Sequence, residues 1–242
     1  MSLLAHAGKI PLLILMTWPQ YVAHTPPNPV VTERSAALPA SVGRATVQLR
    51  PVWMRHVHKA MMEAVILADI LAIAAFFLPA SIALSLPVDE ATFATCARIR
   101  ITPAFLVGWT LLVVGAWLKM ASFRELGKHF TFEVTVQNDH RLVTTGPYSV
   151  VRHPAYTATW IMFVGTVLCA FSEGAWFRES GFLHTWKGRL IALLWVADLT
   201  YAPSMMVFKR VRVEDALMKK TFGKEWDEWT KQTPWAVLPW IY

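Results

Sequence analysis

The chain alternates between long apolar runs and shorter polar connectors. A helix that crosses a bilayer needs about 20 mainly apolar residues, and four runs approach or exceed that length. They are Ala60–Leu86, Ile101–Met120, Ala155–Phe171 and Leu190–Phe208. A shorter run, Ile10–Val22, is interrupted by Pro11 and Pro19. We expect it to form a short first membrane helix; a signal-peptide core behind Lys9 and an interfacial segment are the alternatives. The pattern predicts an all-α integral membrane protein with about five transmembrane helices.

The composition supports a membrane protein. Hydrophobic residues make up 55% of the chain and charged residues only 16%, whereas a soluble domain has about 25% charged residues. The net charge of +7 is better explained by basic cytosolic connectors than by a nucleic-acid partner. Cys96 and Cys169 lie in or beside apolar sequence and form no metal or disulfide framework. His56 and His58 have no further candidate ligands near them in the sequence, so we expect no metal site.

Lysine and arginine are unevenly distributed among the connectors. They are concentrated in residues 121–154 and 209–242, whereas the connectors 87–100 and 172–188 carry both signs. By the positive-inside rule, the two basic segments face the cytosol together. We therefore divide the chain into three parts. These are 1–59 (a short N-terminal membrane segment and a polar connector), 60–120 (membrane helices), and 121–242 (a functional region with a membrane hairpin and a C-terminal amphipathic helix).

The connector before the third long apolar run is not helical in character. Apolar residues alternate with polar ones from Phe130 to Gln137, "QNDH" supplies turn chemistry, and "RLVTTGPY" suggests a second extended piece. The pattern predicts a short hairpin across the cytosolic helix ends. Pro154 suits the first turn of the helix that follows, because that position needs no N–H donor.

The segment after the fourth run reads as an amphipathic helix. Arg210, Glu214 and Leu217 are spaced i, i+4 and i+7, so they share one face. Taken alone, the Arg–Glu pair is ordinary for a solvated helix and contributes a few tenths of a kcal/mol, roughly. Gly223 is expected to end the helix as an αL cap. Trp226 and Trp229 are predicted to be interfacial aromatics.

Two motifs together resemble a known family. "LVTTGPYSVVRHPAY" is followed, about one helical hairpin later, by "RVRVEDALMKKTFGKEWDEW" and a "PW" near the end. This combination resembles the isoprenylcysteine carboxyl methyltransferases over roughly positions 100–242. "RHPxY" alone is less specific, because phospholipid methyltransferases and the C-terminal parts of some sterol reductases carry similar stretches.

The resemblance implies an activity and its setting. Members of this family are membrane enzymes that use S-adenosylmethionine to methylate the C-terminal prenylcysteine of prenylated proteins. It therefore implies S-adenosylmethionine as cofactor, and farnesyl- or geranylgeranyl-cysteine protein termini and membrane lipid as partners. It also implies residence in the endoplasmic reticulum membrane, with the site facing the cytosol.

The resemblance also implies roles for individual residues. Arg210 would contact the substrate carboxylate and is the catalytic candidate. Glu214 would bind the cofactor, and we favour it over Asp215 because the family often has a run of glutamates here. Arg152 is expected only to hold the helix end or to pair with one of these carboxylates. The remaining cofactor-binding candidates are Gln137, His140, Arg141, Leu142, Val143, Tyr148, His153, Pro154, Ala155 and Tyr156.

The chemistry of carboxyl methylation fits these residues. A C-terminal carboxylate has a pKa of about 3.3–3.7, so it is already the nucleophile at neutral pH and needs no general base. The site must instead align it with the methyl carbon, which a planar guanidinium such as that of Arg210 can do. The alternatives are a phospholipid or small-amine N-methyltransferase, a membrane sterol-type reductase, and a non-catalytic scaffold. An N-methyltransferase would need a base, and Arg210 would repel its ammonium substrate.

Three acidic residues lie within or near predicted membrane helices. Asp198 falls inside the fourth long run, where a carboxylate is a functional candidate by default. No part of the family motif covers it, so we expect it to line the interior or support helix packing. We expect the same of Asp69 and Glu63.

Overall fold

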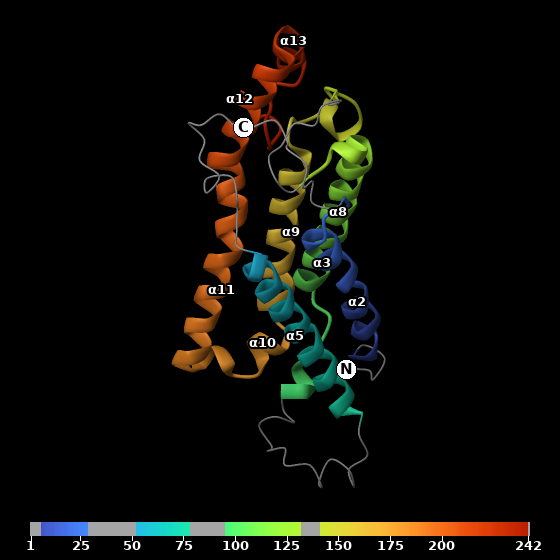
Figure 1. The fold of residues 1–242 in the computed structure, drawn as a ribbon. Helices are drawn as coiled ribbons and strands as arrows, with labels where there is room; N and C mark the ends of the chain where they lie inside the picture. Colours follow the sequence, from blue (N-terminus) through green and yellow to red (C-terminus); the bar gives the residue numbers. More distant parts are fainter. Residues whose placement is uncertain (1–5, 29–51, 78–94, 132–140, 242) are drawn as a thin grey trace.

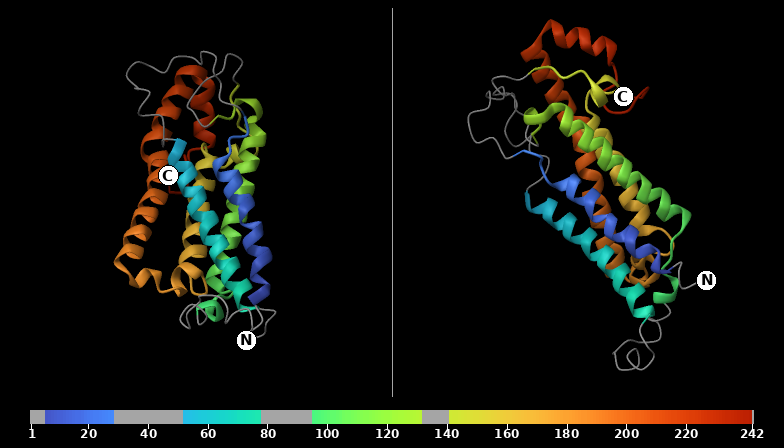
Figure 2. Two further views of the ribbon diagram at one scale, coloured as in Figure 1. Left: turned by 60° about the horizontal axis from the view of Figure 1, so that its bottom comes forward. Right: turned by 90° about the vertical axis from the view of Figure 1, so that its right-hand side faces the viewer.

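The computed structural model describes residues 6–28, 52–77, 95–131 and 141–241 (Figure 1). Over these ranges the chain is helical with connecting turns and contains no strand. The principal helices are α2 (Lys9–Leu15), α3 (Thr17–His24), α5 (Val52–Phe76), α8 (Pro103–Leu126), α9 (Pro154–Phe171), α11 (Trp186–Met205), α12 (Val211–Phe222) and α13 (Lys224–Gln232). Shorter elements are η1 (Gly127–His129), η2 (Gly146–Ser149), α10 (Trp176–Glu179), η3 (Phe182–His184) and the π-turn η4 (Met206–Arg210). The long helices run side by side in an elongated bundle, with α12 and α13 at one end (Figure 2).

Three helical stretches in the described ranges are long and apolar enough to cross a membrane: Pro103–His129, Pro154–Phe171 and Trp186–Phe222. They contain most or all of three of the four predicted long runs. The all-helical class is therefore confirmed over the described residues, which contain three candidate membrane spans where about five were predicted for the whole chain.

The other two predicted spans differ from the structure. The run predicted at Ala60–Leu86 forms helix from Val52 to Phe76, and residues 78–94 lie outside the described part of the chain. The N-terminal run forms two short helices rather than one, and both pack against α5. α5 is not among the three candidate spans, and it carries the charged residues Lys59, Glu63 and Asp69.

A buried ion pair joins the N-terminal helices to the bundle. The Lys9 side chain is fully buried, with Nζ 2.5 Å from Asp69 Oδ2 and 2.8 Å from the Gly174 carbonyl oxygen. The Trp176 N–H donates to the other oxygen of Asp69 at 2.6 Å. Both charges are thus hydrogen-bonded in the core, and the structural role expected for Asp69 agrees with these contacts.

Helices α8 and α9 pack closely because glycines face each other at their interface. A Cβ atom on Gly165 would lie 2.7 Å from the Gly108 carbonyl oxygen and 2.9 Å from the Leu112 nitrogen. Only glycine allows this approach, as at other membrane helix interfaces. Further along α8, a Cβ atom on Gly115 would lie 3.1 Å from the Ala158 carbonyl oxygen, so the two helices are antiparallel and the start of α9 lies toward the end of α8.

The connector that was predicted to face the cytosol lies only partly within the described residues. The predicted hairpin falls mainly on residues 132–140, which lie outside the described ranges. Residues 141–144 run without helix or strand into η2. Pro154 is the first residue of α9, as predicted.

The C-terminal helices confirm one boundary and correct two details. Gly223 ends α12 as predicted, but at φ +55° and ψ −117° it is not an αL cap. Glycine is favoured there because its φ is positive. Trp226 and Trp229 are buried rather than interfacial, because α13 turns their shared face toward Tyr148.

Candidate functional site

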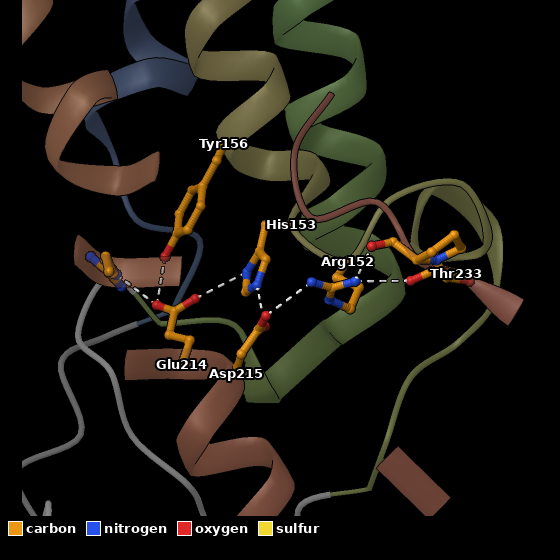
Figure 3. A network of polar contacts seen from close by, with 8 residues as sticks. Arg152, His153, Tyr156, Glu214, Asp215 and Thr233 are labelled. Carbon is orange, nitrogen blue, oxygen red and sulfur yellow. Dashed lines mark hydrogen bonds and ion pairs between the residues drawn. The ribbon is translucent and has the colours of Figure 1, made fainter. Parts of the chain in front are cut away.

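The candidate site lies where the start of α9 meets η4 and the first turn of α12 (Figure 3). Glu214 is its centre. One carboxylate oxygen accepts from Arg210 Nε at 2.6 Å and from the Tyr156 hydroxyl at 2.5 Å. The other lies 3.3 Å from His153 Nδ1. Three residues predicted from two distant motifs therefore share the carboxylate of Glu214, which was itself predicted.

Asp215 is the second acidic member of the network. Its Oδ1 lies 2.7 Å from His153 Nε2, and its Oδ2 accepts from Arg152 Nη2 at 3.1 Å. The sequence ranked Asp215 below Glu214, yet the two adjacent carboxylates together hold both nitrogens of the His153 ring. The only sequence signal for this is that Asp215 follows Glu214 directly.

The surroundings of His153 favour its charged form. Burial alone would lower the pKa of His153, because an imidazolium is costly to desolvate. Hydrogen bonds and negative charge from Asp215 and Glu214 outweigh that effect, so the pKa of His153 is raised above its ordinary value.

Aromatic contacts help to hold the side chains of His153 and Arg210 in place. The His153 ring stacks on Tyr156 with 5.3 Å between centroids and 3° between planes. The Arg210 guanidinium carbon lies 5.7 Å from the centre of the Tyr156 ring, within cation–π range. Arg210 is only 6% exposed, and it ends the π-turn η4. Such turns are frequent at functional sites, and the apolar periodicity of the sequence did not indicate this one.

A second cluster forms beside the first. Tyr148 is buried with Trp226 and Trp229, and Leu142 and Val143 pack against them. Burial first, and then the negative charge of Glu214 and Glu125, raise the pKa of Tyr148, so its phenol is neutral. Trp229 Nε1 is buried and has no hydrogen-bond partner within the described ranges. Trp229 is thus a candidate that sequence reasoning missed, although its i+3 spacing from Trp226 marked a shared face.

The remaining candidates are placed as follows. Pro154 and Ala155 are buried in the first turn of α9, and Arg141 is exposed. Gln137 and His140 lie outside the described residues. The binding roles of all these residues stay predictions.

The other residues singled out from the sequence are not in the network drawn in Figure 3. Asp198 is half-buried in α11, and Glu63 pairs with Lys59 one turn away at 3.7 Å. His58 is buried, and its Nδ1 accepts from Trp195 Nε1 at 3.2 Å. This hydrogen bond joins α5 to α11 and is therefore a helix-packing contact. The described ranges contain no group of three potential metal ligands.

Comparison with known proteins agrees with the motifs. Residues 103–177 match the family model described as phospholipid methyltransferase. This segment contains α8, η2 and α9, and so includes Tyr148, His153 and Tyr156. It ends before Arg210 and Glu214.

Individual relatives extend the match. Protein-S-isoprenylcysteine O-methyltransferase B of Arabidopsis thaliana is 26% identical over 134 residues, which are 54% of this chain and 57% of the relative. The predicted resemblance is confirmed. The protein-S-isoprenylcysteine O-methyltransferase of Schizosaccharomyces pombe is 26% identical over 52% of this chain and 46% of its own length. The Delta(14)-sterol reductase TM7SF2 of Mus musculus is 26% identical over 42% of this chain and 20% of its own length. The chain spans about half the length of the isoprenylcysteine methyltransferases it matches.

Proposed function

We propose that this protein is a membrane methyltransferase that uses S-adenosylmethionine to esterify the C-terminal prenylcysteine carboxylate of prenylated proteins. The observation that carries the proposal is Arg210, a guanidinium that is buried where η4 meets α12, within the candidate span Trp186–Phe222, and that is fixed by Glu214. A buried cation at the boundary between hydrocarbon and water suits an acceptor that has an apolar chain and a carboxylate.

The residues at the site fit the proposed cofactor. S-adenosylmethionine supplies the methyl group, attached to a cationic sulfur. The Glu214 carboxylate can accept from the α-ammonium or a ribose hydroxyl, and the stacked rings of His153 and Tyr156 present aromatic surface. Trp229 offers a buried indole N–H for which the described residues supply no acceptor. Tyr148 stands beside it as a neutral phenol.

The protein's part in the reaction is alignment and exclusion of water. The substrate carboxylate is ionised at neutral pH, so no residue needs to remove a proton. The bond from Arg210 Nε to Glu214 sets the plane of the guanidinium, whose terminal nitrogens then orient the carboxylate. Arg210 and Tyr156 are both buried, which keeps these interactions in a low-dielectric setting where they are stronger than in water.

The membrane setting suits the substrate. A prenyl chain resides in hydrocarbon, and we place its entry laterally between the helices that contain residues 101–120 and 190–208. α11, which covers most of the latter range, exposes Leu193 and Leu194, a face suited to lipid. The positive-inside pattern favours a cytosolic site, and residence in the endoplasmic reticulum follows the family resemblance.

A phospholipid or small-amine N-methyltransferase is the second candidate. The name of the matching family model favours it, since that match covers α8 and α9. Arg210 argues against it, because a buried guanidinium beside the acceptor would repel an amine that becomes cationic on methylation. The sterol reductase relative leaves a reductase as the weaker alternative.

The test is transfer of labelled methyl from S-adenosylmethionine to farnesylcysteine with a free carboxylate, in membranes containing the protein. We expect base-labile methyl ester with the wild type and loss of ester with Arg210→Ala. Arg212→Ala is the matched control, because Arg212 is exposed two residues away, and it should retain activity. Labelled phospholipid without ester would favour the second candidate. If neither methyl ester nor labelled phospholipid forms, methyl transfer to either class of acceptor is rejected.

A further inference from the structure

Residues Thr233–Val237, which follow α13, form a strap across the start of α9. The Arg152 N–H donates to the Trp235 carbonyl at 2.9 Å, and the His153 N–H donates to the Ala236 carbonyl at 2.8 Å. One turn into α9, the Thr157 hydroxyl donates to the Val237 carbonyl at 2.5 Å. The strap therefore supplies acceptors to N–H groups at the start of α9, a helix end that needs partners from outside the helix.

The Arg152 side chain fastens the strap to α12. Its Nη1 donates to the Thr233 carbonyl at 3.1 Å and also to the Pro234 carbonyl, while Nη2 donates to Asp215 at 3.1 Å. Figure 3 shows the guanidinium between the carboxylate of Asp215 and the strap. One planar group thus joins three segments: the residues just before α9, helix α12 at Asp215, and the strap.

The strap packs against residues of the proposed site. Ala236 and Val237 are 4% and 0% exposed, and they cluster with Tyr156 and Val211. Met206 and Val207, from the turn that ends at Arg210, pack against the same cluster. Displacement of the strap would loosen both the tyrosine that bonds Glu214 and the turn that presents Arg210.

We propose that Arg152 is a positioning residue that fastens the strap and thereby sets the spacing between the His153–Tyr156 turn of α9 and the Arg210–Glu214 turn of α12. It contacts neither cofactor nor acceptor. Arginine is required because its rigid fork reaches two carbonyls and a carboxylate at once, whereas a lysine ammonium is a single point charge. The consequence for cofactor binding rests on the proposed function, whereas the fastening of the strap does not.

The first experiment measures the strap directly. In detergent-solubilised full-length protein, hydrogen exchange at the His153 amide reports its bond to the Ala236 carbonyl. We expect exchange to be about tenfold faster in Arg152→Gln, equivalent to about 1.4 kcal/mol of lost protection. Arg178→Gln, which replaces an exposed arginine that has no bond to the strap, should leave the exchange rate unchanged. Equal exchange in the wild type and Arg152→Gln overturns the fastening role.

The second experiment measures binding of labelled S-adenosylmethionine by equilibrium dialysis. We expect about tenfold weaker binding in Arg152→Gln, a smaller loss in Arg152→Lys and none in the exposed control Arg178→Gln. If the wild type binds no cofactor, the proposed function fails while the exchange result stands. If the wild type and Arg152→Gln bind equally well, the positioning role fails.

A separate variant protects the test against misfolding. Thr157→Val is nearly isosteric and removes one strap bond without changing any charge. If Arg152→Gln does not fold, Thr157→Val should still show faster exchange at His153 and weaker cofactor binding at an unchanged melting temperature. If Thr157→Val shows the same exchange rate at His153 and the same cofactor affinity as the wild type, the proposal is overturned.

Discussion

The two ends of the bundle each contain a buried ion pair, and the pairs are built differently. Lys9 and Asp69 are 2.5 Å apart, and their side chains are 0% and 2% exposed. Arg210 and Glu214 are 2.6 Å apart, and their side chains are 7% and 18% exposed. The first pair is completed by backbone groups of Gly174 and Trp176. The carboxylate of the second is shared with side chains of another helix.

The difference indicates which pair can rearrange. Backbone partners cannot leave without unfolding the turn that carries them, so the Lys9–Asp69 pair is a fixed joint. Tyr156 and His153 contact Glu214 only through side chains, so we expect a ligand group to replace Glu214 without a change in the backbone. The same chemistry therefore stabilises the fold at one end and provides a candidate binding site at the other.

The largest expected effect is at the fixed joint. Asp69→Ala leaves the Lys9 ammonium buried without its carboxylate, which should cost about 3–5 kcal/mol of unfolding free energy. Denaturant unfolding in detergent measures this. The double variant Lys9→Met/Asp69→Leu should recover most of the loss. If Asp69→Ala alone hardly changes the free energy of unfolding, the Lys9–Asp69 pair does not hold the N-terminal helices to the bundle. The two ion pairs would then not differ in the way described above.

Arg210→Lys should affect activity more than stability. The charge remains, but the fork that aligns the carboxylate is lost, and such misplacement costs roughly 100-fold in rate. Methyl ester formation and melting temperature, measured on the same preparation, check this. Arg212→Lys should change neither. A large fall in melting temperature with Arg210→Lys would make this pair structural, like the one at the other end.

The His153 environment predicts a pH dependence of stability. Because the pKa of His153 is raised in the folded state, the stabilisation is fully present below the ordinary value of about 6.5 and is lost as the pH rises through the raised value. Unfolding free energies of the wild type should therefore fall over this window relative to those of His153→Gln. Parallel profiles for the two proteins would show that the two carboxylates do not stabilise the imidazolium.

The smallest effect is expected at the second cluster. Trp229→Phe keeps an aromatic ring but removes the indole N–H, which has no partner in the described part of the chain. Stability should fall by about 1 kcal/mol, because the smaller ring leaves a small cavity beside Tyr148 and Trp226, whereas no internal hydrogen bond is lost. Binding of S-adenosylmethionine should weaken a few-fold if the N–H meets the cofactor. Unchanged binding would leave Trp229 as a packing residue.

Local patterns predicted much of the helical framework. Three apolar runs correspond to the candidate spans, and Pro154 and Gly223 lie at helix boundaries as expected. Local patterns gave wrong predictions where tertiary packing determines the structure. The apolar N-terminal run is divided into two helices, and the face of Trp226 and Trp229 is buried because α13 turns it against Tyr148.

The sequence by itself determined the helical class, the resemblance to the isoprenylcysteine methyltransferases, and four residues that meet in the network: His153, Tyr156, Arg210 and Glu214. Runs of apolar residues and a charged i, i+4 pair are local properties, so they can be read without coordinates. The pairing of Arg152 with one of the two carboxylates was also predicted and is confirmed. Only the tertiary structure decided that its partner is Asp215 and that Thr233–Val237 cross the start of α9. Those contacts link residues about 60 to 80 positions apart, and the packing of α9 against η4 and α12 brings them together.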